Sequence, residues 1–145
     1  MSVVVDAYAV VAALVGEPAR RDVEPHLPTA LISASNLAEV IDVCIRVHRN
    51  EENAVRERID WLLAGGLQVV PLERQLAVAA GALRARRYDR RNCQISLGDC
   101  VAVEVARSRR LPLATSDPHL AGAAWAEEIE VLALPDSHGR RPRRR

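Results

Sequence analysis

Near its start the chain reads Val3-Val4-Val5-Asp6-Ala7, and an uninterrupted apolar segment then runs from Ala7 to Val15 before Gly16. Three consecutive Val residues are typical of a short strand that is buried on both faces of a sheet. The apolar segment that follows is typical of a buried helix, and Gly16 is a helix-ending residue. This stretch therefore predicts a strand followed at once by a helix.

The same alternation continues along the rest of the chain. Four further strands are predicted at the apolar runs 30–33, 67–72, 111–115 and 129–134. Helices are predicted over 19–24, 36–49, 51–64, 73–87 and 98–109, with Pro25 closing the first of them and Ser35 capping the second. Strands that alternate with helices favour a three-layer α/β/α sandwich around a mostly parallel central sheet of about five strands.

The chain is long enough for one folded domain. We assign residues 1–135 to this domain and expect residues 136–145, which are polar and rich in Arg, to form a mobile tail. No apolar stretch approaches the ~20 residues that cross a bilayer, and no signal-peptide pattern is visible. The three Cys residues share no CxxC spacing. We therefore expect a cytoplasmic protein with reduced thiols and no membrane association.

The basic residues are unevenly distributed. All 20 are Arg, and five lie within 84–91 and five within 140–145, although the formal net charge is only +1. The planar guanidinium group suits phosphate, but codon bias in a GC-rich genome explains the absence of Lys equally well. With two Trp, two Tyr and no Phe, an aromatic platform for stacking RNA bases is not expected.

Acidic residues follow the predicted strands. Asp6 comes directly after the first strand and Asp117 after the fourth, so both are expected at the carboxyl edge of the sheet, where ligands bind in α/β folds. Asp99 lies in the first turn of its helix and Glu39 about one turn into another, and each can point back to that edge. Converging carboxylates repel one another unless a divalent cation binds them. The pattern therefore favours a Mg²⁺ or Mn²⁺ site.

Each of these acids also has a purely structural interpretation. Asp6 and Asp117 are equally well explained as helix caps, and Asp99 as a partner of the helix dipole. Glu39 belongs to a polar stripe typical of the wet face of an amphipathic helix, which comprises Asn36, Glu39, Asp42, Arg46 and Arg49. His119 has no second His at metal-binding spacing. No Gly-x-Ser-x-Gly elbow or Gly-rich phosphate loop occurs, which disfavours serine-nucleophile and P-loop chemistry.

Four short motifs that contain these acids occur in order along the chain. They are Val3-Val4-Val5-Asp6-Ala7, Ser33-Ala34-Ser35-Asn36-Leu37-Ala38-Glu39-Val40, Ser96-Leu97-Gly98-Asp99 and Ala114-Thr115-Ser116-Asp117. The set resembles the acidic motifs of PIN-domain nucleases, and in particular the VapC toxins of bacterial toxin–antitoxin pairs, from Val3 to about Leu134. The resemblance implies that Asp6, Glu39, Asp99 and Asp117 are catalytic, metal-binding residues and that Thr115 supports them by hydrogen bonding.

The implied activity is that of a metal-dependent endoribonuclease, with Mg²⁺ or Mn²⁺ as cofactor and a water that attacks phosphorus in line. The resemblance also implies a small antitoxin partner and a homodimer. Arg87, Arg90 and Arg91 precede the helix of Asp99 and are predicted to bind RNA phosphates, unless arginines of this cluster pair with surface acids instead. The Arg-rich tail is expected to contribute less, because it must lose conformational entropy on binding.

Two other functions remain open from the sequence. A non-catalytic α/β module that docks on protein or RNA would use the same acids for helix caps and solubility. A phosphatase with Asp6 as its nucleophile would need a second Asp two residues further on, where Tyr8 stands. If the chain cuts RNA and a chelator stops the cleavage, it is not a non-catalytic module. If it releases inorganic phosphate from phosphate monoesters, it is a phosphatase.

Overall fold

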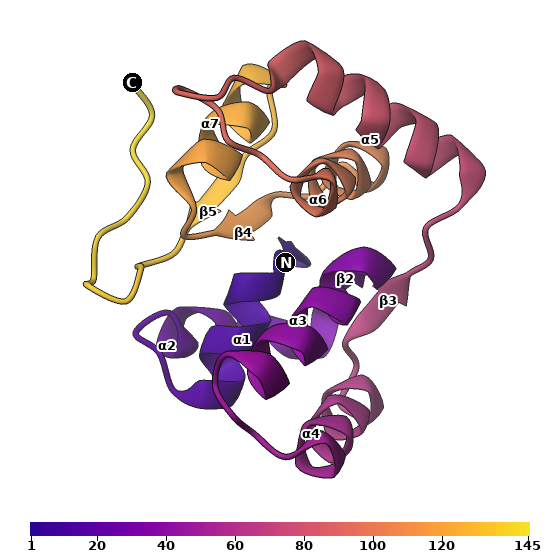
Figure 1. The fold of residues 1–145 in the computed structure, drawn as a ribbon, viewed down its shortest axis with the longest axis vertical. Helices are drawn as coiled ribbons and strands as arrows, with labels where there is room; N and C mark the ends of the chain where they lie inside the picture. Colours follow the sequence, from indigo (N-terminus) through magenta and orange to yellow (C-terminus); the bar gives the residue numbers. More distant parts are fainter.

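A five-stranded sheet forms the centre of the computed structural model, which describes residues 1–145 (Figure 1). The strands are β1 (Val4–Val5), β2 (Leu31–Ser33), β3 (Gln68–Val70), β4 (Leu113–Thr115) and β5 (Val131–Ala133). Their order is β3-β2-β1-β4-β5, and every neighbouring pair is parallel. The carboxyl ends of all five strands therefore meet at one edge of the sheet.

Helices cover both faces of this sheet. They are α1 (Ala7–Val15), α2 (Arg20–Val23), the 3₁₀ helix η1 (Glu24–Thr29), α3 (Ala34–Arg46), α4 (Glu52–Ala64), α5 (Arg74–Arg87), α6 (Leu97–Arg109) and α7 (Pro118–Ala126). Helices α1 to α4 share one hydrophobic core with Val3 and Val5, and α5 to α7 share a second core with Val4. This division follows from the alternation of side chains along a strand. The predicted three-layer α/β/α sandwich is confirmed (Figure 1).

The predicted helix over 19–24 ends at Val23, close to its expected end, but helical structure continues past Pro25 as η1, where a Pro in the first turn has no intrahelical hydrogen bond to lose. The helix predicted over 36–49 begins earlier, at Ala34, and ends earlier, at Arg46. The cap of α3 is Ser33 rather than Ser35, since the Ser33 hydroxyl accepts a 3.0 Å hydrogen bond from the backbone N–H of Asn36. The last residue of β2 thus also caps the helix that follows.

Helix α7 was not predicted at all. Asp117 caps it and Pro118 occupies its first position, a combination that favours helix starts. The remainder is rich in Ala, and its residues Leu120, Ala121, Ala123 and Ala124 are all buried. A short helix with so little polar surface has no 3.6-residue alternation that could reveal it in the sequence.

Residues 136–145 form neither helix nor strand, and their predicted mobility stays a prediction. Arg141 nevertheless contacts the domain through Asp22, at 2.6 Å. Cys44 and Cys100 are buried free thiols, and Cys93 is partly buried. Every helix is too short or too polar to cross a lipid bilayer.

Candidate active site

Asp6 is the buried member of the acidic group at the carboxyl edge. It directly follows β1, it is 4% exposed, and its Oδ1 accepts a 2.7 Å hydrogen bond from the N–H of Ala9 in the first turn of α1. Burial raises the pKa of Asp6 from 3.8 to about 7. Hydrogen bonds from Thr115 and Ala9 partly offset this rise, whereas the charges of Asp99 and Asp117 add to it. The three aspartates are therefore electrostatically coupled.

Asp117 lies two residues beyond β4, the neighbour of β1 in the sheet. Its Oδ1 accepts hydrogen bonds from the N–H groups of His119 (2.7 Å) and Leu120 (3.4 Å), and so caps α7. The fully buried Thr115 accepts a 3.0 Å hydrogen bond from the backbone N–H of Asp117 through its hydroxyl. The Thr115 side chain also lowers the pKa of Asp6, so this residue at the end of β4 acts on the acids that follow two adjacent strands.

Asp99 belongs to a capping box at the start of α6. The Ser96 hydroxyl accepts a hydrogen bond from the Asp99 N–H (3.0 Å), and Asp99 Oδ2 accepts one from the Ser96 N–H (2.7 Å). Burial raises the pKa of Asp99, the bonds to Ser96 lower it, and the charge of Asp117 raises it again. The Ser-x-x-Asp spacing was visible in the sequence, but the part of Ser96 in holding Asp99 was not inferred from it.

Glu39 reaches the site from α3, across a close approach of α3 to the start of α6. A Cβ atom at Gly98 would lie 3.7 Å from Oε2 of Glu39 and 3.2 Å from Oδ1 of Asn36. The pKa of Glu39 is raised by partial burial and then by the charges of Asp99 and Asp42. The close approach at Gly98 places Glu39 against the first turn of α6, which carries Asp99, and the charges of Asp99 and Asp117 act on Asp6.

Asn36 is a residue of this edge that the sequence interpretation misplaced. It was assigned to the wet stripe of its helix, but it is 1% exposed. Its Nδ2 is the one buried side-chain nitrogen or oxygen without a hydrogen-bond partner. An unpaired buried donor costs about 1–3 kcal/mol, so Asn36 is retained in the first turn of α3 at a cost to stability. Nothing in the local sequence distinguishes it from an exposed helix residue.

The capping and metal-binding interpretations of the acids are compatible. Asp6, Asp99 and Asp117 each use one carboxylate oxygen for backbone N–H groups, and the second oxygen of Asp99 and of Asp117 accepts no hydrogen bond from the protein. In this structure, no group of three or more Asp, Glu, Cys or His side chains is arranged so that it could hold a metal ion. Hard oxygen donors that raise one another's pKa nevertheless match the ligand chemistry of Mg²⁺ or Mn²⁺, which would relieve their repulsion.

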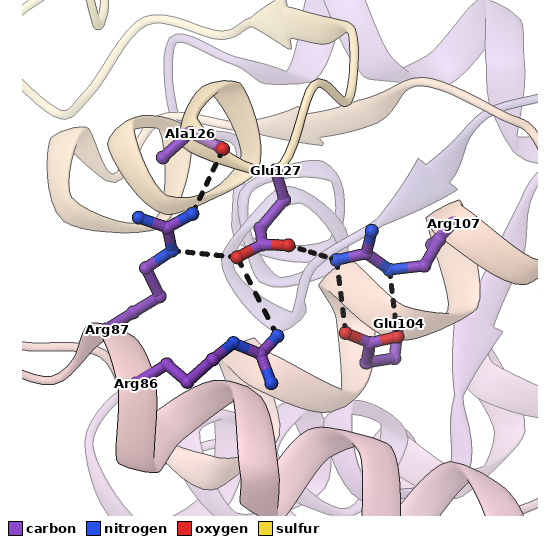
Figure 2. Close-up of polar contacts among 6 residues, drawn as sticks. All are labelled: Arg86, Arg87, Glu104, Arg107, Ala126 and Glu127. Atoms are coloured by element: carbon purple, nitrogen blue, oxygen red, sulfur yellow. Dashed lines mark hydrogen bonds and ion pairs between the residues drawn. The ribbon is translucent and has the colours of Figure 1, made fainter.

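The arginines of the predicted RNA-binding cluster divide into two groups. Figure 2 shows Arg86, Arg87 and Arg107 around the carboxylate of Glu127, whose side chain is 10% exposed. Burial opposes ionisation of Glu127, but hydrogen bonds from Arg107 and Arg87 outweigh it and lower the pKa. The alternative that arginines of this cluster pair with acidic side chains therefore applies to Arg86 and Arg87. Arg87 also donates to the carbonyl of Ala126 (3.1 Å), at the opposite end of α7 from Asp117.

Arg90 and Arg91 are exposed and have no acidic partner. Their loop is closed by a β-bridge between Asp89 and Cys93. It is attached to the first turn of α7, where Nδ1 of His119 accepts a 3.3 Å hydrogen bond from the N–H of Gln94. The loop thus reaches the end of α7 that Asp117 caps.

Comparison with known proteins supports the fold. A sequence model described as PIN domain matches residues 3–126, and no curated protein sequence matches the chain. The solved VapBC2 complex from Rickettsia felis, bound to a DNA fragment from its promoter, is 16% identical with a TM-score of 0.67, covering 90% of this chain and 97% of that chain. The sarcin-ricin-loop-cleaving toxin VapC20 from Mycobacterium tuberculosis is 19% identical with a TM-score of 0.67, covering 83% and 94%. FitAcB from Neisseria gonorrhoeae is 22% identical with a TM-score of 0.64, covering 90% and 96%.

Proposed function

Because the chain belongs to the PIN domain family, we propose that it is a metal-dependent endoribonuclease whose active site comprises Asp6, Glu39, Asp99 and Asp117. The observation that carries the proposal is the position of these acids: Asp6 and Asp117 follow the adjacent parallel strands β1 and β4, and Glu39 lies against the first turn of α6, which carries Asp99. Such a group of carboxylates is unfavourable for folding by itself, so its presence indicates a function.

Each residue of the proposed active site has its own role. Asp6, Asp99 and Asp117 would hold Mg²⁺ or Mn²⁺, and the bound ion would supply the positive charge that activates a water and stabilises the phosphodiester during hydrolysis. Glu39, on the exposed side of the site, binds the cation or orients the attacking water. Thr115 positions Asp117 through the hydrogen bond that its hydroxyl accepts from the Asp117 N–H, and it lowers the pKa of Asp6. The products are a 5′-phosphate and a 3′-hydroxyl.

Cleavage of a labelled single-stranded RNA by the purified chain tests this function. We expect cleavage with Mn²⁺ or Mg²⁺, none with excess chelator, and recovery when the ion is returned. Ligation of the products to an adaptor that requires a 5′-phosphate checks the chemistry of the ends. If neither ion supports cleavage, or if the chelator leaves it unchanged, the proposed function is wrong.

We further propose that the chain is the toxin of a toxin–antitoxin pair. The support is its likeness in fold to VapBC2 and to the toxin VapC20. An antitoxin segment that crosses the carboxyl edge would pair a basic side chain with the aspartates and compete with the metal. Expression alone should arrest growth, and co-expression of the small neighbouring reading frame should restore it. Normal growth during expression of the active chain would contradict the toxin role.

A non-catalytic binding module is the second candidate, and two observations favour it. All three aspartates serve as helix caps or in a capping box. No ready-made group of three metal ligands is present. Such a module would bind RNA but leave it intact with Mg²⁺, Mn²⁺ or chelator, so the cleavage experiment distinguishes the two functions.

A further inference from the structure

Residues 136–140 form a closed turn that fixes the start of the Arg-rich segment. The Asp136 carboxylate accepts hydrogen bonds from the N–H groups of His138 (2.8 Å) and Arg140 (2.9 Å). The backbone N–H of Asp136 donates to the carbonyl of Arg140 at 2.8 Å. Gly139 has a φ of 78°, a conformation that few other residues adopt easily. The chain therefore reverses direction here.

The next two residues attach the segment to the domain. The guanidinium group of Arg141 donates a 2.6 Å hydrogen bond to the carbonyl of Ala133 in β5, and it forms a 2.6 Å ion pair with Asp22 of α2. Pro142 is buried. The segment thus runs from the edge strand to α2 before its last residues, Arg143 to Arg145, become exposed. In the view of Figure 1 it ends on the side of the molecule that carries β5 and α7.

This attachment lies at the same edge of the sheet as the acids. Ala133 pairs in register with Thr115, two residues before Asp117. The N–H of Leu134 extends this pairing, because it donates to the carbonyl of Thr115 at 2.9 Å. Asp136 follows two residues later, so the turn begins at the carboxyl edge of the sheet.

We propose that Arg143, Arg144 and Arg145 form an arm that binds phosphates of single-stranded RNA flanking the scissile bond, an inference that rests on the proposed function. All three are exposed and have no acidic partner. Three extended residues span about 10 Å, which brings the guanidinium groups within reach of RNA that lies along the carboxyl edge.

The anchored turn changes the entropy of this contact. From the sequence, the whole tail was expected to lose conformational freedom on binding and so to contribute less than Arg87, Arg90 and Arg91. With residues 136–142 held by these contacts, only Arg143 to Arg145 have to be ordered, so the loss of entropy on binding is smaller than for a wholly mobile tail.

RNA affinity measured in chelator, where no cleavage occurs, tests the arm directly. We compare the intact chain with a variant in which Arg143, Arg144 and Arg145 are all changed to Gln. A matched control changes Arg46, Arg49 and Arg56 to Gln, which removes equal charge near the far end of α3 and the start of α4. Because each phosphate contact to a single strand adds about 0.7 to the salt slope, the arm variant should lose about 2 in log–log slope, and the control much less.

The substitution Asp22→Asn tests the anchor while keeping every arginine. It makes the net charge more positive, so a purely non-specific charge effect would strengthen RNA binding. Loss of the anchor predicts weaker binding instead, because Arg141 is released and the arm must be ordered. Stronger or unchanged binding of Asp22→Asn would overturn the anchored arm.

The arm proposal and the proposed function fail in different ways. If the intact chain cuts RNA but the arm variant and its control bind RNA with equal affinity and equal salt slope, the arm proposal alone is overturned. That result is also expected if the arm contacts an acidic protein rather than RNA. If the intact chain cuts no RNA with either ion, the proposed function itself is wrong.

Discussion

The guanidinium group of Arg87 donates a 2.7 Å hydrogen bond from Nε to Oε1 of Glu127, which joins the last turn of α5 to the end of α7 (Figure 2). Arg107 of α6 binds the other oxygen of the same carboxylate, so three helices meet at one acid. Glu127→Gln would leave Arg87 without its counter-charge, whereas Arg107 would keep its ion pair with Glu104. Because they are 39% and 42% exposed and can regain water, we expect a loss of only about 1–2 kcal/mol in unfolding free energy.

Chemical unfolding of Glu127→Gln beside Glu57→Gln, an exposed acid without an ion pair, checks this expectation. The pKa of Glu127 is lowered from its ordinary value of 4.5, so its contribution is present above about pH 4.5 and is lost as the pH falls further. The difference between Glu127→Gln and the native protein should therefore shrink in acid. Equal losses in the two variants at pH 7 would show that the cluster contributes no stability.

Asp6→Asn should stabilise the metal-free protein at neutral and alkaline pH. The folded-state pKa is about 7 against 3.8 for the ordinary group, so the folded state binds the proton more tightly than the unfolded state. The stabilisation that protonated Asp6 contributes to the folded state is fully present below about pH 4 and is lost as the pH rises through 7. Asn caps a helix about as well as Asp, so removal of the charge should gain up to about 4 kcal/mol at pH 8, at about 1.4 kcal/mol per pKa unit.

Urea unfolding in chelator at pH 4, 6 and 8 measures this gain, with the exposed Asp60→Asn as the matched control. The advantage of Asp6→Asn over the native chain should grow from pH 4 to pH 8. It should diminish when Mg²⁺ is added, because only the native site gains from the ion. An advantage that is largest at pH 4 would contradict the buried, proton-binding state of Asp6.

Gly66→Ala should destabilise the fold strongly. Gly66 has a φ of 120°, and a Cβ atom there would lie 2.1 Å from the carbonyl oxygen of Pro28. Backbone strain and the clash together predict a loss of roughly 2 kcal/mol or more. In the control Gly122→Ala, on the exposed side of α7, nothing lies within 4 Å of the new Cβ, and a gain of about 0.5–1 kcal/mol is expected. Thermal unfolding of both variants measures these effects. A Gly66→Ala variant as stable as the native chain would contradict the close approach to Pro28.

We propose that the chain forms a homodimer through α5. Only Ala80 and Leu83 of this helix are buried, whereas Val78 is 67% exposed among small residues that would let a second helix approach closely. Val78→Arg should convert a dimer to a monomer in light scattering at micromolar concentration. Trp61→Arg, an exposed apolar residue of α4, should leave the dimer intact. A native chain that is already monomeric would contradict the proposal.

The sequence predicted the features that depend on neighbouring residues. Val3 to Val5 indicated a strand buried on both faces, and Gly16 indicated the end of α1, where it adopts a φ of 81°. The position of Asp6 and Asp117 after parallel strands indicated that they share one edge, because strand direction alone determines this.

Features that depend on distant partners could not be predicted in the same way. Arg87 and Glu127 lie 40 residues apart, and neither residue type marks its partner. Asn36 has the spacing of an exposed helix residue and is buried only because the start of α6 packs against it at Gly98. The segment around Asp136 to Arg140 has a composition typical of disorder, so the turn that these residues form could not be predicted.

If the acids at the carboxyl edge form a metal-dependent nuclease site, single Asn variants of these acids will cut RNA more slowly than the native chain. Asp6→Asn, Asp99→Asn and Asp117→Asn are assayed in Mn²⁺ beside the exposed control Asp60→Asn, after unfolding measurements confirm that all four are folded. The account predicts that each site variant loses at least about a hundredfold in rate, because a charged ligand is replaced by a neutral side chain of the same shape. Asp60→Asn should cut at the native rate. Native-rate cleavage by all three folded site variants would contradict the claim.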